Sequence, residues 1–296
     1  MQHGPDILCI GSVLWDVIGR APRRMGLGHD VPGRITRLPG GVAMNVAMAC
    51  LREGMRPALL TVLGRDAEGQ ALGAACAAMG LVTDHVVWSD QLETDAYMAI
   101  EDETGLIAAV ADAQSLERAG GDILAPLRDG RLGREEAPWA GLIALDGNLS
   151  EALLAEIAAS PLFARADLRI VPASPGKAAR LIPLLDHPGA TLYLNRVEAG
   201  LICNAKFPDA AAAAEALRES GARRVVVTDG AGPVAEAADG VLRRATPPRV
   251  SVSRVTGAGD TFMAAHVAAE ARGLSAHAAL EAALAATAAY VSEAGA

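Results

Sequence analysis

The sequence predicts an α/β protein: a three-layer sandwich with helices on both faces of a mostly parallel central sheet, and a small β lid. Two observations lead to this fold class. Short, continuously apolar runs alternate with longer segments of helical periodicity, which is typical of parallel strands joined by helical crossovers. Two stretches rich in turn residues interrupt this alternation and contain only short extended pieces.

Six apolar runs have the length and composition of buried strands, and five of the segments between them have the pattern of helices. The predicted strands span residues 7–10, 58–62, 142–145, 168–171, 192–194 and 225–228. The predicted helices span residues 42–52, 68–79, 151–159, 210–220 and 261–272. The handedness of crossovers and the rules for packed layers then favour a doubly wound sheet.

The two interruptions are predicted to be β insertions over the edge of the sheet. Residues 16–39 are rich in Gly, Pro and Arg, and residues 84–111 have a strand–turn–strand pattern. We therefore expect one domain over residues 1–296, with lid elements at about 12–39 and 84–111. A lid would exclude water from a reactive phosphate, and a surface hairpin without a role is the alternative.

Composition and charge exclude several classes of protein. A formal net charge of −9 argues against a general nucleic-acid binder, which needs a basic face to displace counterions from phosphates. The sequence contains neither a run of about 18 apolar residues nor the basic start of a signal peptide. Its four cysteines are scattered without a C-x-x-C pair, which favours apolar packing in a reducing compartment. We expect a cytoplasmic protein with neither nucleic acid nor membrane as partner.

The segment before the helix predicted at 261–272 carries the clearest chemical signal. Gly257, Ala258 and Gly259 bring main-chain N–H groups to a helix start, where the helix dipole adds about half a positive charge and favours an anion. Asp260 lies at the same place, although a carboxylate would repel a bound phosphate. The position of this carboxylate is explained if Asp260 removes a proton from an attacking hydroxyl. The alternative is a plain turn followed by a helix N-cap.

A second glycine-rich segment opens the helix predicted at 42–52. Gly40 and Gly41 again allow a ligand near main-chain amides, and Asn45 lies one turn inside, where its amide can donate to and accept from vicinal hydroxyls. Asp16 follows the first strand, at the carboxyl end where open α/β sheets bind ligands.

These segments together resemble the PfkB carbohydrate kinases, also called the ribokinase-like family. Residues 40–64 fit the first signature of the family in full, and residues 255–265 fit most of the second. Between them, residues 195–198 are similar to the N-x-x-E motif and residues 227–232 to the nucleotide-binding strand and turn; residues 64–69 match an early G-x-D-x-x-G turn. The resemblance implies a ribokinase-like fold, ATP and Mg²⁺ as cofactors, and a small sugar or nucleoside as substrate.

Within the family, softer signals are similar to the pseudouridine kinases. Residues 97–112 resemble their lid strands and the segment after them, residues 146–150 resemble a D-A-N-L-S stretch, and residues 174–178 an S-x-x-K-A stretch. Val171 departs from this pattern, which usually has Asp there. Arg254 stands where relatives usually have a small polar or acidic residue near a monovalent-cation loop, so K⁺ activation is not expected.

The resemblance implies a role for each candidate residue. The substrate would contact Asp16, Gly40, Gly41, Asn45, Asp112 and Asn148. Asp260 would be the general base, with an anion hole at Gly257, Ala258 and Gly259. The nucleotide would contact Asn195, Thr228, Gly230, Gly232, Gly257 and Gly259, with residues 282–289 beside the adenine. Glu198, with Asn195, would hold Mg²⁺ through water. The alternative for Glu198 is a favourable charge at a helix start.

The expected reaction is transfer of the γ-phosphoryl group of ATP to the 5′-hydroxyl of pseudouridine. The alternative within the same class is another sugar or nucleoside kinase of the ribose, fructose or adenosine type. The alternative from a different class is a catalytically silent nucleoside-binding protein, although a silent relative has no chemical need for Asp260. For Arg196 and Lys177, a solvated or locally paired cation is favoured over a phosphate clamp. The resemblance also favours a homodimer that pairs through the lid.

Overall fold

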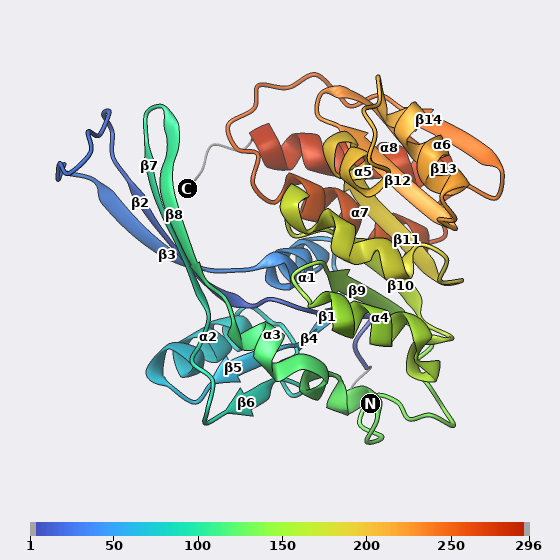
Figure 1. The fold of residues 1–296 in the computed structure, drawn as a ribbon, viewed down its shortest axis with the longest axis horizontal. Coiled ribbons are helices and arrows are strands. Elements are labelled where there is room, and N and C mark those ends of the chain that lie inside the picture. Colours follow the sequence, from blue (N-terminus) through green and yellow to red (C-terminus); the bar gives the residue numbers. More distant parts are fainter. Residues whose placement is uncertain (1–3, 293–296) are drawn as a thin grey trace.

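The computed structural model describes residues 4–292. It consists of an α/β body built on one large sheet and a four-stranded sheet that projects from one side of the body (Figure 1). Within these residues, none of the helices combines the length and apolar character needed to cross a bilayer.

The large sheet has eight strands in the order β14-β13-β12-β11-β10-β9-β1-β4. Six neighbouring strands are parallel: β1 (Ile7–Ile10), β4 (Pro57–Leu60), β9 (Leu142–Asp146), β10 (Asp167–Val171), β11 (Ala190–Asn195) and β12 (Arg224–Asp229). At one edge, β13 (Gly232–Ala238) and β14 (Val241–Ala245) continue the sheet antiparallel. The carboxyl ends of the parallel strands therefore meet at one edge of the sheet, the usual place for a ligand site.

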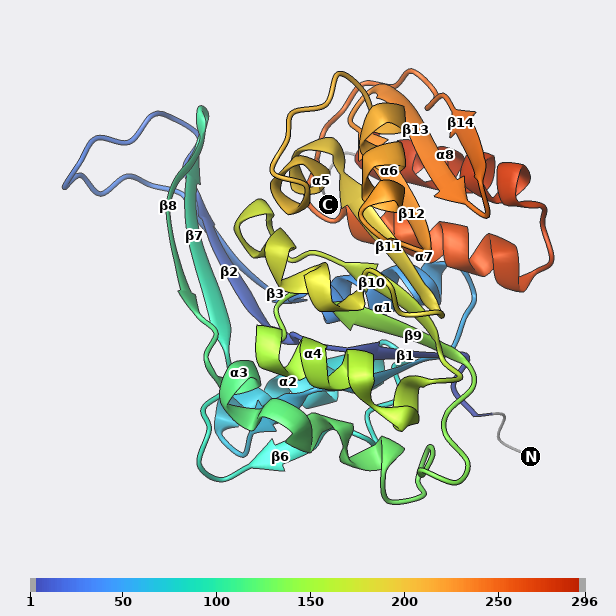
Figure 2. The same cartoon turned by 45° about the vertical axis from the view of Figure 1, so that its right-hand side comes forward.

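Helices cover both faces of this sheet (Figure 2). One face packs against α1 (Val42–Arg52), α2 (Ala67–Ala78), α7 (Ala258–Ala271) and α8 (Ala276–Ser292). The other face packs against α3 (Ser115–Ala119), α4 (Glu151–Ala159), α5 (Arg196–Ile202), α6 (Ala210–Glu219) and the 3₁₀ segments η1 (Gly120–Leu127), η2 (Pro161–Phe163) and η3 (Pro175–Leu184). The three-layer α/β/α sandwich expected from the sequence is confirmed.

Each central strand contributes to two hydrophobic cores because successive side chains point to opposite faces. In β1, Ile7 and Cys9 pack with α1, α2 and α7, whereas Leu8 and Ile10 pack with the helices on the other face, and all four are fully buried. Burial on both faces is the reason that these strands are continuously apolar and do not alternate with polar residues.

The projecting sheet is the lid, with strands in the order β3-β2-β7-β8. Its members are β2 (Leu14–Arg20), β3 (Arg34–Gly40), β7 (Ala96–Asp102) and β8 (Gly105–Asp112). The short strand β6 (Val87–Ser89) lies outside the lid and pairs instead with β5 (Val62–Gly64). Residues 84–95, which were expected to contribute to the lid, therefore do not extend its sheet. All eight residues of β8 are exposed.

Strands β13 and β14 and helix α8 are among the elements of the described chain that were not predicted. The apolar residues of β13 and β14 are interrupted by Glu and Arg, because the buried carboxylate of Glu236 is paired with Arg224 and Arg243. Helix α8 was missed because its Ala-rich composition leaves little contrast between a buried and an exposed face. The strand expected at 58–62 is divided into β4 and β5.

Candidate active site

Helix α7 places the candidate base beside the carboxyl ends of the strands. The helix is preceded by Gly257, whose φ of +79° lies in the left-handed region that favours glycine. A Cβ at this position would lie 2.6 Å from the Tyr290 hydroxyl oxygen, which donates a hydrogen bond to Thr256 O at 2.9 Å. The guanidinium group of Arg254 lies 3.7 Å from the centre of the same Tyr290 ring. The turn before Asp260 is thus fixed by α8 and leaves no room for a side chain at Gly257.

Main-chain amides gather at the start of α7. The amide of Ala258 donates to Val255 O at 3.1 Å, so this member of the expected anion hole is already engaged. Gly259 and Asp260 lie in the first turn, where an α-helix has no carbonyl one turn earlier to accept from the amide. These two amides, with the positive end of the helix dipole, are the donors best suited to bind an anion.

The Asp260 carboxyl has a pKa raised to about 7. Burial is the largest cause, because it disfavours the charged form; the nearby charge of Asp146 adds to it, and that of Glu198 contributes less. A hydrogen bond from the Asn45 side chain acts in the opposite direction. A carboxyl with a pKa near neutrality is well matched to accept a proton at physiological pH.

On the lid side, Asp16 in β2 lies against the glycine pair that precedes α1. A Cβ at Gly40 would overlap the Asp16 carboxylate, and one at Gly41, where φ is +95°, would lie 2.5 Å from Ser12 O. Burial raises the pKa of Asp16 to about 6. Because Asn45 also reaches Asp260 through its side chain, β2, the glycine pair and α1 border the same site as the base.

A buried hydrogen-bond network joins the ends of β1 and β9. Asp146 Oδ2 accepts from the backbone N of Ser12 at 2.8 Å and from its hydroxyl at 2.5 Å, while Asp146 Oδ1 accepts from Asn148 N at 2.7 Å. The Ser12 hydroxyl in turn accepts from Val42 N at 2.9 Å, at the start of α1. Lys177 donates to Asn148 Oδ1 at 2.7 Å, which agrees with the locally paired cation expected for it.

Sequence reasoning missed Ser12 as a member of this network. Its signal is a small hydroxyl side chain in the second position after a fully apolar first strand, at the carboxyl end of that strand. The network fixes the loop in front of α1 and the loop after β9 relative to one another. Asn148 is thereby held next to the site, with its amide shared between Ser12 and Lys177.

A largely apolar cavity of about 600 Å³ lies on the other side of the α7 start. It brings together the sequence-predicted residues Thr228, Gly230, Gly232, Ala258 and Gly259. Leu284, Thr287 and Ala288, from the stretch 282–289 that was expected beside the adenine, line the same cavity. Other walls come from the end of α8 and from the loop at residues 247–255. Of this loop, sequence reasoning connected only Val255 with the site. The size and the apolar walls of this cavity suit a planar heterocycle, and the amide-rich start of α7 lies at one side of it.

Asn195 and Glu198 form a reciprocal capping box at the start of α5. Asn195 Oδ1 accepts from Glu198 N at 2.9 Å, and Glu198 Oε2 accepts from Asn195 N at 2.8 Å. Glu198 therefore does stabilise the start of α5, which was the alternative role considered for it. Burial nevertheless raises the pKa of Glu198, and the charge of Glu198 contributes to the raised pKa of Asp260, so the two carboxyls belong to the same electrostatic surroundings.

Two other sequence-predicted residues lie further from this centre. Asp112 is exposed at the end of β8, opposite Ala96 in the lid sheet, and among the described residues no hydrogen bond joins it to Asp16 or Asp260. Arg196 is paired with Asp229 at 2.8 Å and also donates to Phe207 O, which is the local pairing expected for it.

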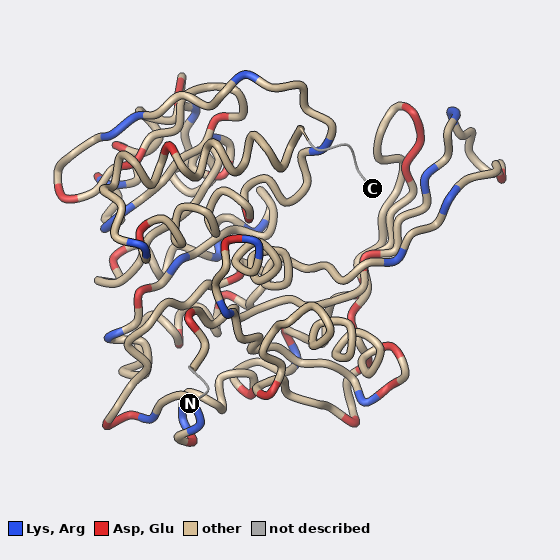
Figure 3. Tube along the Cα trace, turned by 180° about the vertical axis from the view of Figure 1, so that it is seen from behind, with Lys and Arg blue, Asp and Glu red and all other residues tan. Residues whose placement is uncertain are grey.

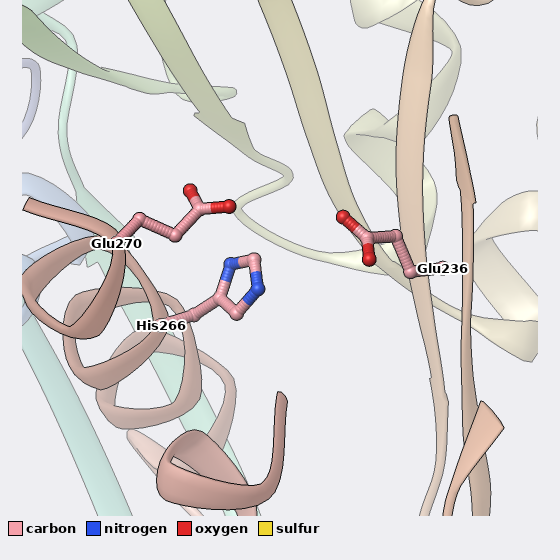
Figure 4. Close-up of side chains that lie close together, drawn as sticks. All are labelled: Glu236, His266 and Glu270. Carbon is pink, nitrogen blue, oxygen red and sulfur yellow. The ribbon is translucent and has the colours of Figure 1, made fainter. Parts of the chain in front are cut away.

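A second group of ionisable side chains lies away from the active site. Glu236, His266 and Glu270 come together between β13 and α7 (Figure 4), near the amino ends of the strands. Although their ligand atoms lie within 4.8 Å of one another, both carboxylates are already paired with Arg224. Arg169 also pairs with Glu270 at 2.5 Å. A metal ion there would have to compete with two guanidinium groups, so this cluster is an ion-pair network.

Comparison with known proteins agrees with this geometry. Residues 5–296 match the family described as pfkB family carbohydrate kinase. The chain is 29% identical to a pseudouridine kinase of Escherichia coli K12, over 89% of this chain and 83% of that protein.

Solved structures of sugar kinases have the same fold. A carbohydrate kinase from Agrobacterium tumefaciens is 26% identical, with a TM-score of 0.79 over 95% of this chain and 89% of that chain. An Arabidopsis thaliana ribokinase solved with ribose and ATP is 20% identical, with the same TM-score over 99% of this chain and 95% of that chain. The chain is therefore an ATP-dependent kinase with a ribokinase-like fold, and it belongs to the pfkB family of carbohydrate kinases.

Proposed function

We propose that this kinase transfers the γ-phosphoryl group of ATP to the 5′-hydroxyl of a nucleoside, and that pseudouridine is its substrate. The observation that supports the reaction is the Asp260 carboxyl at the amide-rich start of α7, with its pKa raised to about 7. It lies between the Asp16 side of the site and the apolar cavity. The preference for pseudouridine rests on the 29% identity to the E. coli enzyme, together with Asp146, Asn148 and Lys177.

In the proposed mechanism, Asp260 accepts the proton of the acceptor hydroxyl as its oxygen attacks the γ-phosphorus. The new bond joins this oxygen to phosphorus, and the bond from phosphorus to the β,γ-bridging oxygen breaks, so ADP leaves with the electron pair. The amides of Gly259 and Asp260, aided by Gly257, stabilise the charge on the transferred group. Gly230 and Gly232 would let the nucleotide approach the backbone after β12, next to Thr228.

The acceptor would be held from the lid side. Asp16, with its pKa raised to about 6, is ionised at neutral pH and can accept hydrogen bonds from a vicinal diol, and Asn45 can both donate and accept. Gly40 and Gly41 leave room for the Asp16 carboxylate and for Ser12 O beside the site, and Asn148 faces the same region from the end of β9. Asp112 would reach the substrate only if the lid moves closer to the body.

Mg²⁺ fits the donor set around the base. Glu198 is buried and Asp260 is half-buried, and loss of solvent raises the pKa of both carboxyls. Such a site favours a cation, and oxygen donors suit Mg²⁺, which keeps much of its hydration. Glu198, with Asn195, would hold the ion through water. An ion held there would neutralise charge on the phosphate oxygens.

The lid is proposed to pair with the lid of a second copy. Its two edge strands, β3 and β8, have no partner strand on their outer edges in the described chain, and both expose apolar side chains: Ile35 is 77% exposed, Leu106 60% and Val110 68%. Open edges with apolar side chains are a template for association. A second lid would cover these residues without blocking the body.

The acceptor can be identified by turnover with a defined set of compounds. With ATP and Mg²⁺, we expect kcat/KM for pseudouridine to exceed that for uridine, adenosine, ribose and fructose by at least about tenfold, because one lost polar contact costs about 1–3 kcal/mol. Chelation of Mg²⁺ by excess EDTA should remove turnover. Exclusive turnover of a free sugar would contradict the nucleoside assignment, and a chain that binds pseudouridine without phosphorylating it would be a silent binding protein.

Replacement of the base separates binding from chemistry. Asp260→Asn should lower kcat by about 10²- to 10⁴-fold, the range for loss of a general base, while ATP binding measured by calorimetry persists. Asp209→Asn is the matched control, because Asp209 also stands at a helix start, where it caps Ala212 N at 2.8 Å. The control should turn over like the wild type. Undiminished turnover by Asp260→Asn would overturn the mechanism.

The pH dependence of kcat/KM should report the ionisation of the base. Only ionised Asp260 can accept a proton, so kcat/KM should rise with pH as it passes about 7 and then level off. Asp16, with a pKa of about 6, adds a second ionisation below this one. The Asp16→Asn variant should turn over more slowly but keep the rise in kcat/KM near pH 7. The residual activity of Asp260→Asn should lack this rise. The same step in both variants would assign the ionisation to another group.

The proposed dimer can be tested by light scattering after size exclusion. We expect a dimer for the wild type and a monomer for Leu106→Lys/Val110→Lys, because two buried charges would face each other at the contact. Val241→Lys alters an exposed residue on the edge strand β14 of the body and should leave the dimer intact. A monomeric wild type, or equal dissociation of the control, would refute pairing through the lid.

A further inference from the structure

A second cavity lies at the edge of the large sheet opposite the active site. Its volume is about 480 Å³, and it is bordered by the amino ends of β10, β11 and β12, the end of α6 and the turn between β13 and β14. Five of its lining residues are arginines: Arg165, Arg169, Arg218, Arg223 and Arg224. None of these residues belongs to the site described above.

The charge of this cavity is opposite to that of the protein. The chain carries a formal net charge of −9, yet the cavity is lined by five guanidinium groups and only two carboxylates, those of Asp167 and Asp239. Figure 3 shows Lys and Arg positions interspersed with Asp and Glu over the body, so the excess of arginine is a property of the cavity lining itself. Repulsion between like charges makes such a cluster unfavourable unless an anion offsets it.

The arginines form two layers with different partners. At the floor, Arg169 donates to Asp167 through two bonds of 2.7 Å and to Glu270 at 2.5 Å, and Arg224 donates to Glu236 at 2.7 Å. Tyr193, His266 and Glu270 lie beneath them, in the network that includes the side chains of Figure 4. The floor is therefore rigid and close to neutral.

The rim arginines lack such partners. Within the described residues, no ion pair joins Arg165, Arg218 or Arg223 to a carboxylate, and the one side-chain bond among them runs from Arg218 to Arg223 O at 3.4 Å. They come from three separate segments: the turn before β10, the last turn of α6 and the residue before β12. These three arginines thus line one hollow without an ion-pair partner among the described residues.

We propose that this hollow is a binding site for a small metabolite that carries a phosphate group. A guanidinium group matches two phosphate oxygens in a bidentate arrangement, and several together select a dianion over a single carboxylate. The fixed floor holds the shape of the cavity, and the rim arginines supply the charge. Its volume exceeds that of inorganic phosphate and fits a sugar phosphate.

Helix α7 connects this site with the catalytic one. Asp260 lies in its first turn and Glu270 in its last, where Glu270 is held by Arg169 and Arg224. The two sites therefore share a rigid element, while their ligands would bind at opposite edges of the sheet. Binding at the arginine cavity does not depend on the kinase reaction, so the two proposals can fail separately.

The proposal is tested by calorimetry on the full chain with pyrophosphate, orthophosphate and ribose 5-phosphate. Arg218→Ala/Arg223→Ala should weaken binding by about tenfold or more, because each lost bond to a charged group is worth at least that factor. Tighter binding of ribose 5-phosphate than of orthophosphate would assign a phosphate ester, and equal binding would assign free phosphate. Both variant residues lie at the rim, so the fold should persist, as circular dichroism can verify.

The control removes the same charge from another part of the surface. Arg118→Ala/Arg134→Ala should bind each anion within about twofold of the wild type. Equal weakening by both pairs would show only a general effect of net charge and would overturn the site. Unchanged binding in Arg218→Ala/Arg223→Ala would overturn it as well, because the anion would then occupy another place, such as the start of α7. Absence of binding to the wild type at millimolar concentration would refute it directly.

Discussion

The ionisation of Asp260 depends on two opposing effects that the rest of the fold maintains. Burial beside Asp146 and Glu198 disfavours the charged carboxylate, whereas the first turn of α7 and the Asn45 side chain favour it. Each contribution requires a different element: β9 supplies Asp146, α5 supplies Glu198 and α1 supplies Asn45. The pKa near 7 is therefore a property of the assembled sandwich and not of the glycine-rich motif alone.

The same helix is anchored at both ends by contacts of different kinds. At its start, the left-handed turn at Gly257 packs against Tyr290 of α8. At its end, Glu270 is paired with two arginines from β10 and β12, and this pairing lowers its pKa to about 2. Fixed ends restrict the position of the base, which favours a preorganised proton acceptor over one that must be ordered when substrate binds.

Much of the body could be predicted because its strands are buried on both faces. β1, α1 and α4 begin and end at the expected residues, since each combines a clear apolar pattern with a glycine or a capping residue. Edge strands β13 and β14 could not be predicted, because Glu236 is buried there by pairing with Arg224, a contact between segments that local sequence does not reveal. Ser12 and the wall formed by residues 247–255 were missed for the same reason: their neighbours are distant in sequence.

The order of these segments along the chain has an evolutionary consequence. The residues proposed to hold the acceptor, from Asp16 to Asn148, all come from the first half of the chain, whereas the apolar cavity is built from residues 228–291. Only Asp260 must act at both the acceptor side and the phosphoryl-donor side of the site. Substitutions in the first half can therefore adapt the acceptor site to a new alcohol without altering the residues that bind the phosphoryl donor. The two sites can change separately although strands from both halves belong to the same large sheet.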